Sequence, residues 1–306
     1  MQVTVLGATG GAGRAITEAL VGADLDVVAV NRSGSSALGT ARAADLATDA
    51  GVRAAVAGSD VVVMAAQPEY HRWPAEFPPM LDRVVEATAD LGAKLVMVDN
   101  LYAYGPGPMP ITEATPHRAT DAKGRVRSQM IEDLLTAHES GRVRVTIGQA
   151  SDYIGPHTNT STITAVTVEP VVAGKDAARW MGDLDQPHAI AWLPDVARAY
   201  VSLVTDERAD GKAWVVPHLG APTGREFIAA LAEAAGRDIT PKAISTGMLR
   251  LAAPFHKPSK ETLGIAYQWT APWTVDSSAF EATFGRFDST SLHHAAQQVV
   301  GAVRVG

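Results

Sequence analysis

The chain has 306 residues, of which 46% are hydrophobic and 19% charged, and its formal net charge is -7. This length can bury one large core or two unequal ones, and the composition is that of a globular protein. The acidic balance argues against a nucleic-acid partner. Because the sequence contains no cysteine, disulfides, thiolate catalysis and zinc–thiolate sites are excluded.

The sequence gives no sign of export or membrane insertion. The N-terminus enters a strand without a charged leader, and no apolar run approaches the roughly 18 residues that a membrane span needs. We therefore expect a cytoplasmic protein with no membrane partner, either a monomer or a homodimer. Asn159-Thr160-Ser161 fits a glycosylation sequon, which we interpret as a chance match because no secretion signal accompanies it.

Strands and helices alternate along the chain. We expect buried strands at residues 2–6, 26–30, 61–65, 94–98, 142–147 and 213–216, and helices at 11–21 and 194–204. Continuous apolar strands separated by helices are typical of a parallel sheet that is covered on both faces. Since crossovers between parallel strands are right-handed, the pattern predicts an α/β fold with a doubly wound, Rossmann-type sheet.

The composition and periodicity of the sequence change after Gly155. Residues 156–190 and 240–275 are rich in proline and glycine and show few periodic runs. We predict a nucleotide-binding domain at residues 1–155, completed by about 188–220. Residues 156–187 and 221–306 would then form most of a second, smaller lobe that binds the substrate.

The segment that follows the first strand carries the most specific signal. It runs Gly7-Ala8-Thr9-Gly10-Gly11-Ala12-Gly13 and opens a helix directly after the strand. Glycines at such a turn let the backbone approach a pyrophosphate, and the helix N-terminus supplies unpaired N–H groups. We therefore predict a dinucleotide at Gly7, Thr9, Gly10, Gly11, Ala12 and Gly13.

The end of the second strand bears on which dinucleotide is bound. NAD sites usually place an acid there to accept a hydrogen bond from the ribose 2′-hydroxyl, but this sequence has Asn31, Arg32 and Ser33. Arg32 could pair with a 2′-phosphate, which an acid would repel. We predict NADP(H) in preference to NAD(H), with Asn31 and Arg32 as contacts.

The spacing of Gly7, Gly10 and Gly13 resembles the short-chain dehydrogenase/reductase superfamily, most closely its extended and atypical, NAD-dependent epimerase/dehydratase-like members. Later segments agree with this resemblance: residues 99–105 match the stretch that usually reads Ser-Ser-x-x-Val-Tyr-Gly, and residues 151–156 match the segment that lines the nicotinamide. The resemblance implies further cofactor contacts at Asp45, Leu46, Ala65, Ala66, Gln67, Lys123, Ala150, Asp152 and Tyr153.

The catalytic positions depart from the family pattern, which has a Tyr with a Lys four residues later on one helix. Counting back from Glu132 places Ser128 at the Lys position and Gly124 at the Tyr position, and Asn100 at the usual catalytic Ser. Asn100 could donate a hydrogen bond to a carbonyl but cannot deliver a proton. Tyr102 and Lys123 are our other catalytic candidates. Water or an acidic hydroxyl of the substrate could also supply the proton.

Three functions are compatible with these features. The first is an NADP(H)-dependent reductase of a ketone or quinone on a bulky apolar small molecule, such as a secondary metabolite. The second is a non-catalytic NADP(H)-sensing regulatory protein, which the missing groups would explain. The third is a sugar-nucleotide epimerase or dehydratase, although such reactions depend on the Tyr–Lys pair. The nine histidines show no metal-binding spacing, so we predict no metal site.

Overall fold

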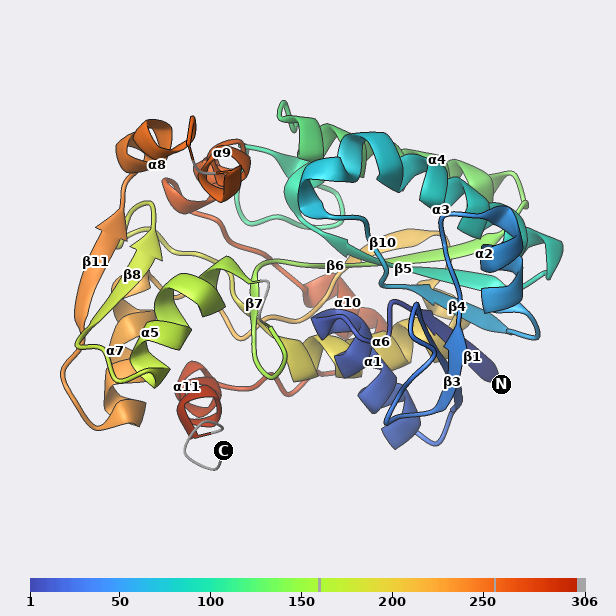
Figure 1. Cartoon of the computed structure of the whole chain (residues 1–306), viewed down its shortest axis with the longest axis horizontal. Helices are drawn as coiled ribbons and strands as arrows, with labels where there is room; N and C mark the ends of the chain where they lie inside the picture. The colour runs from blue at the N-terminus through green and yellow to red at the C-terminus, as the bar shows by residue number, and fades with distance from the viewer. Residues whose placement is uncertain (159–160, 256, 302–306) are drawn as a thin grey trace.

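A computed structural model describes residues 1–158, 161–255 and 257–301, so Asn159 and Thr160 of the sequon lie outside the described residues. The centre of the molecule is a parallel sheet of seven strands in the order β10-β6-β5-β4-β1-β2-β3 (Figure 1). The strands are β1 (Gln2–Leu6), β2 (Asp26–Asn31), β3 (Thr40–Ala43), β4 (Val61–Met64), β5 (Lys94–Asn100), β6 (Arg144–Ala150) and β10 (Lys212–Val215). The predicted doubly wound α/β fold is confirmed.

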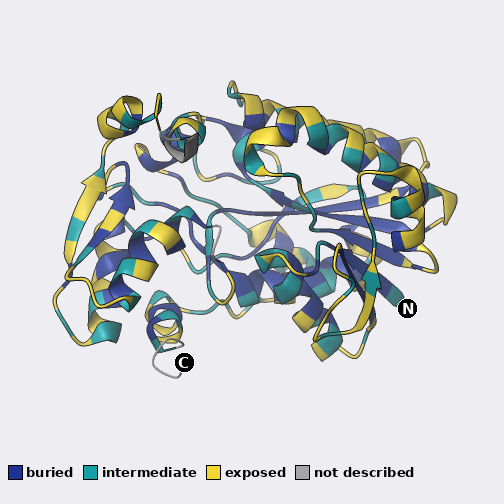
Figure 2. Ribbon diagram, viewed as in Figure 1, coloured by how far each residue is buried: buried dark blue, intermediate teal, exposed yellow. Residues whose placement is uncertain are grey.

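Helices cover both faces of this sheet. One face packs against α2 (Asp49–Val56), α3 (Trp73–Asp90) and α4 (Ala122–Glu139). The other packs against α1 (Gly11–Gly22), α6 (Leu193–Thr205) and α10 (Ser278–Phe284). Figure 2 shows the central strands buried between these layers and the exposed residues on the outer sides of the helices. Such double coverage explains why the strands are apolar on both faces.

The edge strand β3 was not expected from the sequence. Three of its four residues are exposed, so Thr-Ala-Arg-Ala has no apolar run that would reveal it. Its Arg42 donates to the carbonyl oxygen of Ala55 near the end of α2 at 2.6 Å. The strand therefore contributes to the structure through its backbone ladder with β2 and through this helix contact.

The second lobe contains a parallel pair of strands, β8 (Ala177–Met181) and β11 (Thr240–Ile244). Helices α5 (Glu169–Val172), α7 (Gly224–Ala235) and α11 (Leu292–Gly301) contribute to the apolar core of this lobe. Two further helices, α8 (Thr246–Ala252) and α9 (Lys257–Leu263), follow β11 (Figure 1). Neither strand was expected, because most of β11 is polar or exposed and its partner lies some 60 residues earlier in the chain.

The last part of the chain does not lie wholly in the second lobe. Helix α10 returns to the central sheet, where Phe280 and Phe284 contact the ring of Trp214 with centroid distances of 6.4 and 5.0 Å. Two short strands, β7 (Tyr153–Ile154) and β9 (Ala191–Trp192), pair where the chain leaves the central sheet and returns to it. None of the helices in the described ranges is long and apolar enough to cross a membrane.

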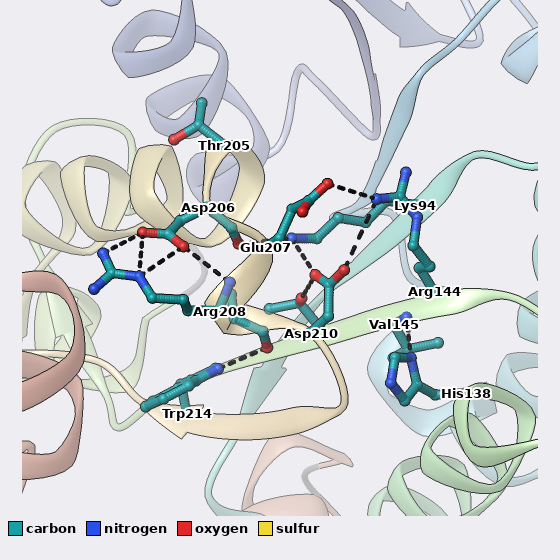
Figure 3. A network of polar contacts seen from close by, with 12 residues as sticks. Lys94, His138, Arg144, Val145, Thr205, Asp206, Glu207, Arg208, Asp210 and Trp214 are labelled. Carbon is teal, nitrogen blue, oxygen red and sulfur yellow. Dashed lines mark hydrogen bonds and ion pairs between the residues drawn. The ribbon is translucent and has the colours of Figure 1, made fainter. Parts of the chain in front are cut away.

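A buried ion pair joins β5 to the turn before β10. The Nζ atom of Lys94 lies 2.6 Å from Asp210 (Figure 3), and the two side chains are 3% and 13% exposed. Thr146 donates to the same carboxylate at 3.1 Å. Burial lowers the pKa of Lys94, and the hydrogen bond to Asp210 opposes that shift. This charge is therefore tolerated only because its partner is in place.

We predict that Asp210→Asn lowers the free energy of unfolding by about 3–5 kcal/mol, because it leaves a buried ammonium without its carboxylate. Urea unfolding at neutral pH measures the loss. The lost attraction lowers the pKa of Lys94 further, so the deficit should shrink as the pH rises toward the ordinary lysine value of about 10.4.

Glu207→Gln is the matched control, since Glu207 lies on the same turn, is 89% exposed and pairs with Arg144 at 3.7 Å. It should cost no more than about 0.5 kcal/mol. Equal losses in the two variants would show that the Lys94–Asp210 pair has no special role.

Candidate functional site

In the glycine loop between β1 and α1, some glycines have no room for a side chain and others do. Gly7 has a φ of +85°, and a Cβ atom there would lie 2.7 Å from the backbone of Ala66. A Cβ atom on Gly13 would lie 2.2 Å from the carbonyl oxygen of Gly7. At Gly10 the nearest atom would be 3.5 Å away. The fold itself thus requires glycine at positions 7 and 13, whereas Gly10 is left open toward a ligand.

The N-terminus of α1 suits a phosphate group. No side chain caps the helix at Gly10, and its first turn carries no acid. The first N–H groups of a helix have no acceptor within the helix and attract an anion. A Cβ atom on Gly11 would lie 2.6 Å from the carbonyl oxygen of His157, so the loop after β7 reaches this point. These features fit the predicted dinucleotide.

The loop after β2 presents Arg32 to solvent. Asn31 is buried, and its side chain donates to Ser35 O and accepts from Ser33 Oγ and Gly34 N at 2.7–2.8 Å. These bonds fix the loop that carries Arg32, for which no protein partner is found among the described residues. The contact of Asn31 with the cofactor stays a prediction, as do those of Asp45 and Leu46 in the segment after β3.

A cavity of about 680 Å³ opens beyond the carboxyl ends of β4, β5 and β6. It begins beside Ala12 of α1 and extends to Trp273 between the two lobes. The predicted cofactor and substrate residues that line it are Ala12, Ala65, Ala66, Gln67, Asn100, Tyr102, Ala150, Asp152 and Tyr153. Parallel α/β sheets bind their ligands at this edge.

A buried arginine forms one wall of the cavity. Arg127 Nη1 lies 3.0 Å from Asp99 Oδ1, and Nη2 donates to Gln67 at 3.2 Å. The guanidinium group stacks over the rings of Trp73 and Phe77 at 4.3 and 4.5 Å. Burial raises the pKa of Asp99 and lowers that of Arg127, while the attraction between the two opposes both shifts. The pair holds α3, α4 and β5 together around the cavity.

Helix α4 faces the cavity with residues other than those that the family spacing indicated. A Cβ atom on Gly124 would lie 2.3 Å from Ala119, and Ser128 bonds to His117 at 3.2 Å, so both positions pack away from the cavity. Arg127 lines the cavity instead. Lys123 and Arg127 are four residues apart, one helical turn, and thus occupy the face that the Tyr–Lys pair was expected to use.

The three catalytic candidates, Asn100, Tyr102 and Lys123, differ in their hydrogen bonds and in their access to the cavity. Asn100 lines the cavity and accepts from Tyr102 N at 3.0 Å, which leaves its amide N–H groups available to a ligand. Burial raises the pKa of Tyr102 well above the ordinary value, so this phenol is a weak proton donor. Lys123 binds Glu261 and lies 4.1 Å from the centroid of the Tyr70 ring. Lys123 therefore lies behind Tyr70 and Glu261, which line the cavity.

Several site residues were missed in the sequence because they come from distant segments. Tyr70 lies in the short helical turn Tyr70–Arg72, and Trp73 is the first residue of α3. Glu261 lies on α9, and Gln268 lies on the helical turn Ala266–Trp269. The run of aromatic residues at 267–273 was a usable signal: Trp273 lines the cavity, while Trp269 is buried and stacks on His188 at 3.8 Å. His188, which contacts Asp152, belongs to no such run, so no sequence pattern indicated it as a site residue.

We predict that Gly10→Ala changes the stability of the cofactor-free protein by less than about 1 kcal/mol, because the new methyl group meets no protein atom closer than 3.5 Å and the lower chain entropy of alanine offsets its poorer capping of α1. The same change should weaken NADPH binding by at least about tenfold, since the methyl group occupies the approach of the pyrophosphate. Calorimetric titration and urea unfolding measure the two effects.

Gly13→Ala is the contrasting variant, because its methyl group would collide with the loop backbone and should cost about 1–3 kcal/mol of stability. If Gly10→Ala bound NADPH as the wild type does, the loop would not be the pyrophosphate site.

Solved structures confirm the fold. WbmH from Bordetella bronchiseptica, solved with NAD+, is 20% identical, with a TM-score of 0.75 and coverage of 99% of this chain and 98% of that one. A nucleoside-diphosphate-sugar epimerase from Pseudomonas aeruginosa is 18% identical, with a TM-score of 0.80 and coverage of 100% and 98%. RMD from Pseudomonas aeruginosa, solved with NADPH, is 16% identical, with a TM-score of 0.77 and coverage of 100% and 99%.

None of the curated proteins matches this chain in sequence. A family profile does, over residues 3–216, and its description is the NAD dependent epimerase/dehydratase family. The match covers the glycine loop, the cavity edge of the sheet and the return to β10, and it supports a nicotinamide cofactor. With the predicted resemblance thus confirmed, the chain belongs to the NAD-dependent epimerase/dehydratase family.

Proposed function

We propose that the protein is an NADP(H)-dependent oxidoreductase that reduces a ketone or quinone carbonyl on a bulky, uncharged, apolar molecule. The observation that carries this proposal is the charge pattern of the cavity. Each acid among the described lining residues faces a basic side chain: Asp99 faces Arg127, Asp152 faces His188, Glu261 faces Lys123 and Glu69 faces His71. None of these four carboxyl groups is therefore left without a basic neighbour.

This pairing bears on the class of substrate. Of the described residues that line the cavity, the cationic or potentially cationic ones are Arg127 and His71, and each faces an acid. A diphosphate would bring two negative charges to walls that offer no unengaged cation, at a high desolvation cost. The remaining surface is largely aromatic, from Tyr70, Trp73, Phe77, Tyr102 and Trp273, and suits a flat apolar molecule.

A nicotinamide cofactor would supply hydride chemistry, and this chain would supply orientation. Asn100 is the last residue of β5 and is paired in register with Ala150 of β6, so both lie at the same edge of the sheet. The amide N–H groups of Asn100 can hold a carbonyl oxygen of the substrate there. Family membership favours a second candidate, an epimerase or dehydratase acting on a sugar nucleotide. The paired charges argue against it, as do Lys123 and Arg127, which occupy the face of α4 where a Tyr–Lys pair was expected.

An assay that follows NADPH and product together separates the candidates. The probes are uncharged aromatic ketones and quinones in one arm, and UDP-glucose with NAD+ in the other. We expect NADPH to be consumed with the ketones or quinones, with one alcohol or hydroquinone formed for each NADPH. Epimerisation of UDP-glucose would favour the second candidate. Tight NADPH binding without turnover in either arm would favour a regulatory protein.

We predict that Arg32→Ala weakens NADPH binding by at least about tenfold, or about 1.4 kcal/mol, because it removes the cation that pairs with the 2′-phosphate. NADH binding should not change. Calorimetric titration of both cofactors measures the difference.

Arg53→Ala is the control. Arg53 is an exposed arginine on α2 that pairs with Asp90 of α3 at 3.7 Å. Its removal should leave the affinities for NADPH and NADH unchanged. A loss that was equal for NADPH and NADH in Arg32→Ala would contradict the assignment of the 2′-phosphate.

A further inference from the structure

Asp152 and His188 meet at the wall of the cavity from two separate segments. Asp152 follows β6 and lines the cavity, whereas His188 precedes β9 and is 1% exposed. His188 Nε2 lies 2.9 Å from Asp152 Oδ2. The imidazole stacks on Trp269 with an interplanar angle of 15° and meets the edge of Trp180 at 6.0 Å, so its orientation is fixed.

The partners of His188 show how many protons the pair holds. Nδ1 lies 3.0 Å from the carbonyl oxygen of Gln268, which can only accept, so Nδ1 must carry a hydrogen. Nε2 then faces a carboxyl oxygen. Two lone pairs that face each other at this distance repel, whereas a proton between Nε2 and Oδ2 makes the contact a hydrogen bond. The geometry therefore favours one proton more than a neutral imidazole and a carboxylate would have.

A neighbouring histidine shows the contrasting arrangement. His218 Nδ1 lies 2.6 Å from the carbonyl oxygen of Val216, and Nε2 accepts from the backbone N–H of Ser151 at 2.9 Å. One donor and one acceptor satisfy a neutral imidazole, and burial lowers the pKa of His218 to about 4. The extra proton thus belongs to the Asp152–His188 pair and is not a general property of buried histidines in this fold.

We propose that Asp152, held and recharged by His188, is the proton donor to the substrate oxygen, a role that the usual tyrosine cannot fill here. This inference rests on the proposed carbonyl reduction. His188 is the positioning residue, because it is enclosed behind Asp152 and does not line the cavity.

The step balances with a single hydride donor. A reduced nicotinamide supplies two electrons and one hydrogen to the carbonyl carbon when it is bound. The carbonyl π bond breaks, and its oxygen takes the shared proton from Asp152, so the product is an alcohol. The pair is left as a carboxylate beside a neutral imidazole, whose facing lone pairs repel, and a proton from solvent restores the shared hydrogen bond.

Other groups at the cavity are poorer donors. Burial raises the pKa of both Tyr70 and Tyr102 far from neutrality. Asp99 is engaged by Arg127, and its side chain is only 1% exposed. Asn100 can hold the oxygen but has no proton to give. Unlike Tyr70, Tyr102, Asp99 and Asn100, Asp152 combines an opening to the cavity with an imidazole partner that can share a proton with it.

The first test is a nuclear magnetic resonance measurement on the full chain at neutral pH. The 15N signals of His188, assigned by their loss in His188→Gln, and the 13Cγ signal of Asp152 together report where protons reside. We expect two protonated nitrogens on His188, or one together with a protonated Asp152. In Asp152→Asn, whose amide can donate to Nε2, His188 should carry a single proton and the fold should be kept. A wild-type His188 with one proton beside an ionised Asp152 overturns the proposal.

The second test measures reduction of 2-acetonaphthone by NADPH. At saturating NADPH, Asp152→Asn should lower kcat by at least about 10²-fold, the size of a general-acid contribution. Glu233→Gln is the control, because Glu233 pairs with His293 at 3.1 Å on an exposed surface of the second lobe. It should reduce the ketone at the wild-type rate. An unchanged kcat in Asp152→Asn overturns the donor role.

The two tests separate this inference from the proposed function. If the wild type reduces neither this ketone nor the other uncharged carbonyl probes, the reductase proposal fails, and the resonance measurement still decides whether the pair holds its proton.

Discussion

The buried pair of Arg127 and Asp99 is the interaction on which the arrangement of the cavity depends. It joins α4 to the end of β5, and the stacked rings of Trp73 and Phe77 add α3 to the same contact. A charge so deeply buried is stable only while its partner stays in place. The cavity edge of the sheet is therefore held by a fixed ion pair where the family pattern places a tyrosine and a lysine.

This substitution changes the chemistry available at the site. An arginine paired with an acid positions the surrounding groups but releases no proton. In the reduction that we propose, proton transfer falls instead to Asp152 with His188, on the segments that lead into the second lobe. In that reduction, orientation belongs to Asn100, charge balance to Arg127 and proton storage to His188, and each residue lies on a different segment of the chain.

The sequence predicted the parts of this structure that depend on local pattern. Apolar strands and the glycine loop follow from burial on both faces and from backbone approach, and both are found where they were expected. The exposed strands β3 and β11 carry no apolar signal, so they were missed. The helical register at Gly124 and Ser128 was misjudged, because family spacing cannot show which face of α4 packs against residues 117–119.

We propose that a nicotinamide ring binds in the cavity between Asn100 and Asp152. A crystal structure of the complex with NADPH would test this placement. We expect the pyrophosphate at Gly10 and Gly11, the 2′-phosphate at Arg32, and the nicotinamide C4 facing the space between the Asn100 amide and the Asp152 carboxyl group. A nicotinamide ring bound outside this cavity, or an Asp152 side chain turned away from the ring, would refute the proposed placement.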